Sequence, residues 1–548
     1  MVKEILGVIL SIGIAQAGNT LITKVDSSGN QYTLYGNTHE SIDFANGYVL
    51  VVNRGFDSTN ILHVHSSPDQ GKTWINNGTA YKGMIGGTAY KACYPTIYGG
   101  EDGPYVFFPY ASDTNFAGMA VIRGIGWGDS IIWGEPKRIG FGMAPPIAVG
   151  KQLENGNVMM ISVAPTLDTM GGIAGFNINY NILSSDLDTV ISNGRVLDTL
   201  ISRDGWFEGW DCKGGRIAGS IWFNPSSHGY FSSDDYGETW NRYRRQKVVP
   251  DSTVFGEAQI LIPQRHSQVA FREDSIPIYV GAVAPGDSSI EGIGTGFWYY
   301  SGEIYACPAE SVVQPIQVSK SLYHRALFPS VATGGGKIVV AWLEYTDSII
   351  DKDSDNNKTD IFYSVSEDGG YTWSEPENLT NTPDIIECWP RLAKRIDTLN
   401  HKAYVLYATS YPDQDLDIER LTIMRGFQFE QPIYINVAVI DLAPPPKVQE
   451  PSPEILKDLT LYPIQPNPSS DNVFVSYYLP VHTQVSLKVY NSVGMVVKTL
   501  VDKNQNAGYK TIAWDGRDNK GRPLPKGVYF CELKALGSSK RAKLILLH

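Results

Sequence analysis

The sequence is poor in long apolar runs, in cysteine and in charge. After the first seventeen residues, no segment is long and apolar enough to form a transmembrane helix. The five cysteines are scattered and odd in number, so they do not form a disulfide framework. One or two disulfide bonds are an alternative, but single buried cysteines are favoured. Charged residues make up only 19% of the chain, and a net charge of -12 without Lys/Arg runs argues against nucleic-acid binding.

Glycine and aromatic residues are abundant instead. The chain has 54 Gly, 31 Tyr and 12 Trp among its 548 residues, and 42% of its residues are hydrophobic. This composition is typical of a turn-rich all-β protein with a substantial core. The length exceeds one compact core, which predicts two to four domains or one large repeat body with an appendage.

The N-terminus has the pattern of a secretory signal peptide. Lys3 supplies positive charge, residues 5–14 are apolar, and residues 15–17 read Ala-Gln-Ala, a small-residue cleavage site. The apolar run is too short to span a membrane comfortably. We therefore expect residues 1–17 to be removed and the mature chain to begin near Gly18.

An octet with the pattern S-x-D-x-G-x-T-W occurs at residues 67–74, 233–240 and 366–373. Its Ser and Asp side chains can bond nearby backbone N–H groups and close a tight turn, its Gly tolerates positive φ, and its Trp can pack between sheets. The positions that define the pattern are Ser67, Asp69, Gly71 and Trp74, then Ser233, Asp235, Gly237 and Trp240, then Ser366, Asp368, Gly370 and Trp373.

This octet resembles the Asp-box, or BNR repeat, of sialidase-type β-propellers. The resemblance implies an all-β propeller whose Asp-boxes lie away from the ligand site. About seven strand-pair openings recur at intervals of roughly 50 to 70 residues, which fits four-stranded blades. We therefore predict a propeller of about seven blades over residues 18–442, with six blades as the alternative, and a ring closed by residues 31–35.

The chain changes character after residue 442. Residues 443–458 form a Pro-rich linker, and residues 459–548 alternate apolar and polar positions, as in a small β domain. Landmarks at 466–468, 514–516 and 527–530 resemble the C-terminal sorting domain of type IX secretion substrates, which is similar to the Ig-like domain of flagellar hook-capping proteins. The resemblance implies partnership with the secretion machinery and a bacterial protein that is secreted or held at the outer cell surface. An Ig-like accessory domain without a sorting role is the alternative.

Acids, bases and aromatics cluster at the predicted starts of inner strands, where a propeller channel opens. Such mixtures are typical of carbohydrate sites, although inner-strand ends are often satisfied by neighbouring backbone. The candidates are His39, Glu40, Cys93, Trp210, Asp211, Glu257, His324, Arg325, Glu387, Cys388 and Trp389.

The sialidase resemblance implies an Arg triad, a Tyr nucleophile paired with a Glu, and an Asp acid/base. Asp57 stands before the first octet as the family's acid/base does. Glu257 and Arg272 resemble the paired Glu and the second Arg. Asp211 is a further candidate, since two channel carboxylates separated by roughly 5 to 10 Å would support hydrolysis.

The other catalytic roles of the sialidase family have no matching residue in this sequence. Residues 38–42 contain no Arg where the family has its first one, the stretch ending at Glu344 offers no third Arg, and Trp389 stands where the Tyr is expected. Arg325 or Arg391 would have to substitute. We therefore favour a non-catalytic propeller that binds glycan or protein, with a rearranged sialidase-like hydrolase and a structural surface component as alternatives.

The sequence evidence for a metal site is weaker than that for a carbohydrate site. Asp351, Asp353 and Asp355 resemble the start of a calcium loop, but the loop lacks the Gly and the final acid of that motif, which favours a solvated acidic loop. No cofactor is therefore expected beyond a structural calcium ion. His63 and His65 alternate on one strand and could face a metal, although a partly exposed strand face is the simpler interpretation.

Overall fold

A computed structural model describes the chain from residue 20 to residue 547, with gaps. The gaps are residues 31–39, 56–60, 113–115, 140–147, 168–172, 197–205, 224–226, 247–259, 287–302, 308–315, 320–325, 347–358, 383–384, 386, 410–427, 443–458, 463, 465–466, 468–472, 482 and 506–507. The chain divides into two compact units, residues 1–442 and 443–548. No helix among the described residues is both long and apolar enough to cross a membrane.

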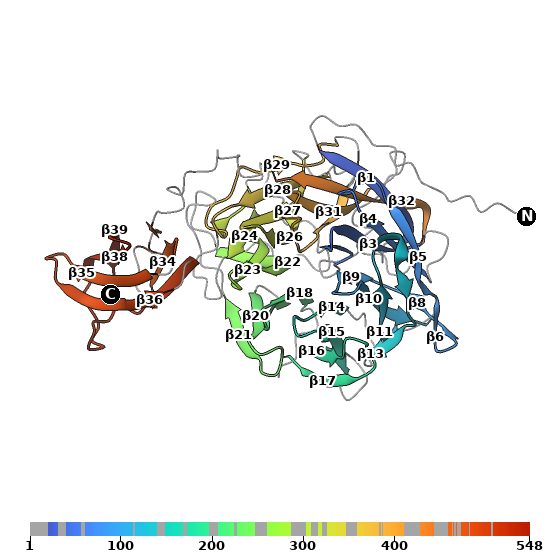
Figure 1. Ribbon diagram of the computed structural model, residues 1–548, viewed down its shortest axis with the longest axis horizontal. Coiled ribbons are helices and arrows are strands. Elements are labelled where there is room, and N and C mark those ends of the chain that lie inside the picture. Colours follow the sequence, from blue (N-terminus) through green and yellow to red (C-terminus); the bar gives the residue numbers. More distant parts are fainter. Residues whose placement is uncertain are drawn as a thin grey trace, which may run out of the picture. The chain divides into compact units, whose positions relative to one another are not determined.

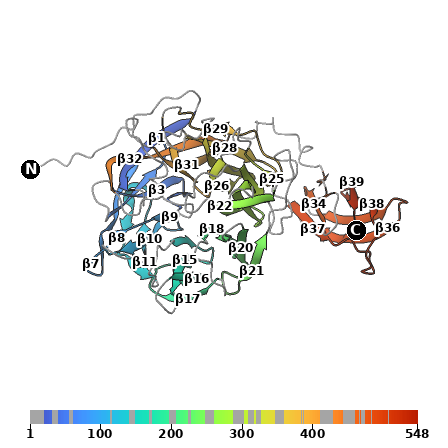
Figure 2. The same cartoon turned by 180° about the vertical axis from the view of Figure 1, so that it is seen from behind.

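The first unit is a β-propeller. Its described strands form seven sheets of four or more strands, which follow one another around a ring in chain order (Figure 1, Figure 2). Within each sheet, neighbouring strands are antiparallel and mostly consecutive in sequence. This up-and-down order requires only short turns, which the abundant glycine supplies.

The first three sheets take the chain to residue 195. The first contains β2 (Ile42–Ala45), β3 (Tyr48–Arg54), β4 (Ile61–Ser67) and β5 (Ile75–Lys82). A small hairpin of β6 (Met84–Ile85) and β7 (Thr88–Ala89) follows. The second contains β8 (Lys91–Ala92), β9 (Thr96–Gly99), β10 (Pro104–Ala111), β11 (Phe116–Ile125), β12 (Ile132–Trp133) and β13 (Lys137–Ile139), with the 3-10 turn η2 (Gly128–Ser130). The third contains β14 (Ala148–Gln152), β15 (Val158–Leu167), β16 (Ile173–Leu183) and β17 (Val190–Arg195).

Four further sheets complete the ring. The fourth contains β18 (Trp206–Lys213), β19 (Arg216–Phe223), β20 (Ser227–Ser233) and β21 (Asn241–Gln246). The fifth contains β22 (Ile260–Phe271), β23 (Pro277–Gly286), β24 (Glu303–Cys307) and β25 (Ile316–Gln317). The sixth contains β26 (Ala326–Gly334), β27 (Lys337–Tyr345), β28 (Thr359–Ser366) and β29 (Glu377–Asn378). The seventh contains β30 (Glu387–Leu392), β31 (Lys402–Thr409), β32 (Gln428–Asp441) and β1 (Leu21–Asn30).

The ring is closed by β1, which pairs antiparallel with β32 from Leu21 opposite Val439 to Asn30 opposite Gln428. The closing strand therefore lies earlier than the predicted residues 31–35, which fall outside the described residues. The apolar alternation of β1 fades after Val25 into Asp-Ser-Ser-Gly-Asn, so its strand character depends on pairing with a distant partner.

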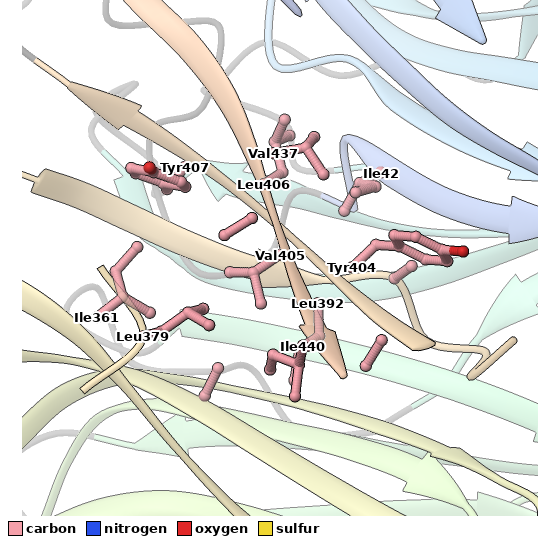
Figure 3. Close-up of a cluster of buried hydrophobic side chains, with 14 of the residues drawn as sticks. Ile42, Ile361, Leu379, Leu392, Tyr404, Val405, Leu406, Tyr407, Val437 and Ile440 are labelled. Carbon is pink, nitrogen blue, oxygen red and sulfur yellow. The ribbon is translucent and has the colours of Figure 1, made fainter. Parts of the chain in front are cut away.

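The apolar side chains lie between adjacent sheets. The largest buried cluster joins the sixth, seventh and first sheets through residues such as Ile42, Ile361, Leu392 and Val437 (Figure 3). β31 is buried at six consecutive positions because both of its faces are covered by neighbouring sheets. A ring of sheets packed face to face is thus held together at every interface by the hydrophobic effect.

The three octets form the predicted Asp-box turns. In the first, Gly71 N donates to Ser67 Oγ at 2.8 Å, while Thr73 N and Oγ1 donate to the two Asp69 carboxylate oxygens at 2.9 and 2.8 Å. Gly71 has φ +84°, which glycine adopts without strain. Trp74 Nε1 donates to Thr23 Oγ1 of β1 at 2.9 Å. The octets beginning at residues 233 and 366 repeat the Ser, Asp, Gly and Thr bonds.

The second unit is a two-sheet β-sandwich, as the Ig-like prediction requires. One sheet contains β33 (Thr460–Leu461), β34 (Val473–Leu479) and β37 (Gly508–Trp514). The other contains β36 (Val496–Gln505), β35 (Thr483–Asn491), β38 (Gly527–Ala535) and β39 (Ser538–Leu546). Trp514 and Cys531 lie in the core between them. Cys93, Cys212, Cys388 and Cys531 are free thiols, in line with the prediction of unpaired cysteines.

Candidate functional site

The two ends of the propeller channel are lined by different turns of the sheets. In a four-stranded antiparallel sheet, the turn after the first strand and the turn after the third lie at the same end. The Asp-boxes follow β4, β20 and β28, the third strands of their sheets, so they share an end with the points where the inner strands finish. We call this the turn end. Five predicted site residues, His39, Asp57, Glu257, His324 and Arg325, lie outside the described residues, as do Asp351, Asp353 and Asp355 of the acidic loop.

A pocket of about 340 Å³ lies at the turn end of the channel. All seven sheets contribute to its wall, because residues of six inner strands and the segment that follows the seventh, β30, converge there. Its lining residues are Asp43, Tyr98, Lys151, Asp211, Cys212, Lys213, Phe271, Glu273, Thr333, Gly334, Lys394, Arg395 and Ile396.

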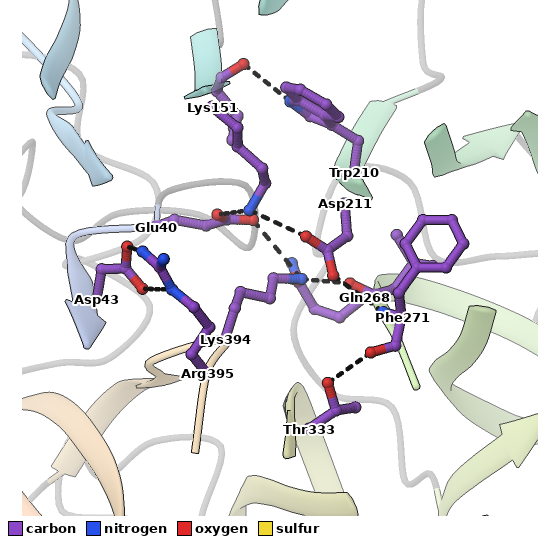
Figure 4. A network of polar contacts seen from close by, with 12 residues as sticks. Glu40, Asp43, Lys151, Trp210, Asp211, Gln268, Phe271, Thr333, Lys394 and Arg395 are labelled. Atoms are coloured by element: carbon purple, nitrogen blue, oxygen red, sulfur yellow. Dashed lines mark hydrogen bonds and ion pairs between the residues drawn. The ribbon is translucent and has the colours of Figure 1, made fainter. Parts of the chain in front are cut away.

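A network of buried charges borders this pocket (Figure 4). Lys151 Nζ lies 2.6 Å from Glu40 Oε2 and 3.5 Å from Asp211 Oδ1. Lys394 Nζ lies 3.6 Å from Glu40 Oε1 and donates to Gln268 Oε1 at 3.1 Å. The Lys151 and Lys394 side chains are 2% and 8% exposed, so water does not replace these partners. Two lysines and two carboxylates therefore neutralise one another in the interior.

The two lysines have different electrostatic environments. Burial opposes the charge of Lys151, but the carboxylates of Glu40 and Asp211 raise its pKa above the ordinary value. Burial lowers the pKa of Lys394, and the repulsion from Lys151 acts in the same direction. Lys151 is therefore the firmly charged member of the pair.

A second ion pair lies at the wall of the pocket. The Arg395 guanidinium is bound by both Asp43 carboxylate oxygens, and its Nη2 donates to the Gly99 carbonyl at 2.9 Å. Its carbon centre lies 4.7 Å from the centroid of the Tyr98 ring. The Arg395 side chain is 40% exposed, whereas that of Asp43 is 4% exposed. Arg395 is thus a fixed cation that solvent and ligands can reach.

Close backbone approach brings these groups together. A Cβ at position 150 would lie 2.1 Å from the Phe107 ring, so Gly150 allows β14 to pack against the second sheet and carry Lys151 inward. A Cβ at position 99 would lie 2.2 Å from the Ala45 Cβ. Gly99 N also donates to Asp43 Oδ2 at 2.9 Å, which fixes the carboxylate that holds Arg395.

The structure corrects the predicted positions of two tryptophans and one acid. Trp210 and Asp211 lie near the end of β18 rather than just before it. Trp210 is fully buried and donates from Nε1 to the Val149 carbonyl at 2.8 Å. Trp389 lies within β30 and is 2% exposed in the largest apolar cluster. Both indoles therefore fill the layers between sheets, where the hydrophobic effect places large aromatics, rather than lining a channel mouth.

Glu387 is also an interior residue rather than a mouth residue. Its carboxylate accepts hydrogen bonds from Ile361 N at 3.0 Å, Thr380 Oγ1 at 2.6 Å and Thr382 Oγ1 at 2.8 Å. It is fully buried. Burial raises its pKa to about 8 and nearby Asp360 adds to the rise, although the hydrogen bonds oppose it.

Arg272 bridges two sheets at the turn end. It follows β22, binds both oxygens of Asp274, and donates from Nη1 to the Gly369 carbonyl of the third Asp-box at 2.8 Å. Burial opposes its charge, but Asp274 raises its pKa. Arg272 therefore acts as a clamp that holds the third Asp-box turn against the fifth sheet. Of the predicted site residues, the described structure brings Glu40 and Asp211 together, around Lys151.

Sequence reasoning missed the cations of the pocket. Lys151, Lys394 and Arg395 were not predicted, and neither were Asp43 and Tyr98. A usable signal was present, because the adjacent Lys394 and Arg395 come two and three residues after the buried strand β30, a position where charge is costly. Their partners are more than one hundred residues away in sequence, so the sequence does not show how that cost is met.

Comparison with known proteins identifies the C-terminal unit. Residues 470–539 match the family model of the FlgD Ig-like domain. No curated protein matches the chain. Among solved structures, the chain is similar to an ulvan lyase of a new polysaccharide lyase family, with 14% identity, a TM-score of 0.45, and coverage of 71% of this chain and 92% of that one.

Two further solved structures are similar at the same level. One is a Penicillium chrysogenum alpha-L-arabinanase complexed with arabinobiose, with 12% identity, a TM-score of 0.40, and coverage of 78% of this chain and 99% of that one. The other is a Trypanosoma rangeli sialidase in complex with the inhibitor DANA, with 9% identity, a TM-score of 0.41, and coverage of 98% of this chain and 87% of that one.

Proposed function

We propose that the chain is an exported bacterial protein whose propeller binds glycans in the turn-end pocket and whose C-terminal Ig-like domain is a type IX sorting domain. The signal-peptide pattern of residues 1–17 supports export. The FlgD Ig-like match supports the second half of the proposal, because the sorting domain resembles that family. On this view the protein is secreted or displayed at the outer cell surface, and the secretion machinery is the partner of its C-terminal domain.

The convergence of all seven sheets on one pocket carries the glycan proposal. Its volume of about 340 Å³ lies at the lower end of the range of about 300 to 1,000 Å³ that is usual for small-ligand sites. Its wall presents the donors of Lys151 and Arg395 and the acceptors of Asp43 and Asp211 within one space. A ligand rich in hydroxyl groups can hydrogen-bond to both kinds of group where they face the pocket, whereas an apolar ligand would desolvate them without replacing the water.

Recognition fits this pocket better than catalysis. Glu40 and Asp211 both engage Lys151, and Asp211 Oδ2 also accepts from Phe271 N at 2.9 Å. A carboxylate that serves as nucleophile or general acid must instead face the scissile bond. The rearranged sialidase-like alternative rests on Asp57 and Glu257, and its test is included below.

A glycan-binding experiment tests the proposal. The purified chain would be titrated with sialylated and neutral oligosaccharides while product release is monitored. Arg395→Gln removes the exposed cation of the pocket, and Arg216→Gln is the matched control, since Arg216 is 28% exposed, pairs with Asp234 and is not among the residues that line the pocket. We expect binding without turnover, weakened about tenfold or more by Arg395→Gln through loss of charge-assisted hydrogen bonds, and unchanged in the control.

Other outcomes would overturn parts of the proposal. Equal binding by wild type and Arg395→Gln would move the ligand away from this pocket. Turnover that is lost in both Glu257→Gln and Asp57→Asn would establish the hydrolase instead. If the chain neither binds nor cleaves any glycan of the panel but captures a surface protein, a protein ligand is favoured. If it captures nothing, a structural role is favoured.

Export is tested separately. Residues 443–548, which form a compact unit, would be fused behind a signal peptide and a fluorescent reporter in a bacterium that has a type IX system. We expect the reporter outside the cell, and retention in the periplasm when β39 is deleted or when the secretion system is inactivated. Export that is independent of the secretion system would leave an Ig-like domain with no sorting role.

A further inference from the structure

Three potential metal ligands meet where the propeller ring closes. Asp26 lies on β1, which belongs to the seventh sheet, while His63 and His65 lie on β4 of the first sheet. Asp26 Oδ2 lies 3.3 Å from His63 Nδ1 and 3.0 Å from His65 Nε2. One ligand atom from each residue lies within 4.8 Å of the other two.

We propose that Asp26, His63 and His65 bind a divalent transition-metal ion, and that Zn²⁺ fits this ligand set best. The ion would join the closing strand to the first sheet. Zinc is bound by imidazole nitrogen and carboxylate oxygen at about 2.0 to 2.2 Å in tetrahedral geometry, which places neighbouring ligand atoms about 3.4 Å apart. The two separations that involve Asp26 are within about 0.4 Å of that value, and the two histidine nitrogens lie within 4.8 Å of each other, so side-chain movements can bring all three atoms around one ion. Neutral imidazole also suits Cu²⁺ and Ni²⁺, whereas Ca²⁺ and Mg²⁺ prefer oxygen ligands.

The backbone turns the carboxylate toward the histidines. Thr23 and Asp26 stand three residues apart, so a regular strand would point them to opposite faces. Both nevertheless contact the first sheet, because Thr23 Oγ1 donates to the Gly71 carbonyl and Asp26 contacts β4. The register of β1 with β32 shifts between Lys24 and Asp26, which leaves Val25 as an extra residue. Such a β-bulge re-aims the following side chain.

A neighbouring amide supports the same carboxylate. Asn53 is fully buried and donates from Nδ2 to Asp26 Oδ2 at 2.8 Å. This is the kind of contact that orients a ligating carboxylate. Asn53 Oδ1 accepts no hydrogen bond in the described part of the chain.

The site is accessible to an ion. The His63 and Asp26 side chains are 25% and 23% exposed, whereas that of His65 is 5% exposed. Three protein ligands with one open side leave a coordination position for water, as in zinc sites with three protein ligands. The proposed ion would bind the folded ring and not the separated strands, so it would stabilise closure by mass action.

Metal titration of the full chain tests the proposal. Chelator-treated protein would be titrated with ZnCl₂ by calorimetry, and its Tm followed with and without the ion. We expect one ion per chain, and a Tm increase of about 3 °C for the propeller transition when free Zn²⁺ exceeds its Kd a hundredfold. Co²⁺ would give a visible absorption band of tetrahedral geometry as an independent readout.

Glutamine variants separate a metal site from a hydrogen-bonded triad. His63→Gln and His65→Gln retain an N–H donor to Asp26 and lose the imidazole ligand, so they are expected to fold as wild type. Zinc affinity should fall by more than about tenfold in each, since loss of an outer-shell partner alone costs that much. His401→Gln, in the β30–β31 connection, is the control. Unchanged zinc affinity in both site variants, or no ion bound by wild type, would overturn the proposal.

Discussion

Glu387→Gln is expected to remove a large part of the pH dependence of propeller stability. The wild-type carboxyl is fully buried at the start of β30, and burial raises its pKa to about 8. Its oxygens accept from one backbone N–H and two threonine hydroxyls, with no basic side chain among these partners. The group therefore folds most favourably in its neutral form.

The direction of the effect follows from linkage. The ordinary pKa of this carboxyl is 4.5, and its folded-state pKa is about 8, so between these values the folded state keeps a proton that the unfolded state releases. Stability contributed by Glu387 is complete below about pH 4.5 and is lost as the pH rises toward 8. At 1.36 kcal/mol per pH unit, the loss between pH 5 and pH 7 is about 2 to 3 kcal/mol.

Glutamine reproduces the neutral acid. Its carbonyl oxygen can accept from Ile361 N and Thr380, while its amide donates to the Thr382 hydroxyl, which lies 3.3 Å from Asp360 Oδ1 and can turn to donate there. We expect Glu387→Gln to match wild type near pH 5 and to exceed its free energy of unfolding by about 2 to 3 kcal/mol near pH 7.

Thermal unfolding between pH 5 and pH 8, followed by tryptophan fluorescence, measures this difference. Subtracting the variant from wild type cancels every other titrating group. Glu377→Gln is the control, because it removes an exposed carboxylate of β29 that bonds the Tyr363 hydroxyl. Parallel pH curves for wild type and Glu387→Gln would refute the reasoning, and so would a variant that is less stable than wild type at pH 8.

Four further variants rank the other polar contacts by their cost in the free energy of unfolding, measured in chemical denaturant. Asp235→Ala leaves the Thr239 N–H and hydroxyl without their acceptor and should cost about 1 to 3 kcal/mol; a cost near zero would contradict the Asp-box account. Lys151→Met leaves the two buried carboxylates Glu40 and Asp211 with Lys394 as their one neighbouring lysine and should cost about 3 to 5 kcal/mol of unfolding free energy. Arg395→Gln, at a half-exposed site, should cost less, and the reverse order would refute the burial argument. Arg272→Gln should cost about 1 to 3 kcal/mol of unfolding free energy because the Gly369 carbonyl loses a charged donor. An unchanged denaturation midpoint would show that Arg272 does not stabilise this turn.

The fold could be predicted largely from local signals. Each Asp-box is closed by side chains of its own eight residues, such as the bonds from Thr73 to Asp69, so the pattern and the turn coincide. The Ig-like unit was predicted from alternation and landmark residues in the same way. The closing strand was placed too late, because β1 is fixed by pairing with β32 about four hundred residues away and its second half lacks apolar alternation.

The site could be predicted only in part, because its geometry depends on long-range contacts. Glu40 and Asp211 were predicted from their positions, but Lys151, which both of them contact, gives no local signal. Trp210 and Trp389 were predicted at a mouth because aromatics are typical of sugar sites, yet burial between sheets is the more favourable place for an indole. Residue type alone does not decide between these two uses.

The buried ion network of Glu40, Asp211, Lys151 and Lys394 offers a test that separates recognition from stability. Replacing a buried ion pair by apolar residues is often neutral or stabilising, whereas removing one partner is costly. The double variant Glu40→Met/Lys151→Met should therefore recover most of the stability that Lys151→Met alone loses, since Asp211 and Lys394 remain to balance each other. If the pocket binds glycan as proposed, binding should not recover, because the pocket still lacks one of its lining cations. Recovery of both properties together would show that the network serves the fold alone.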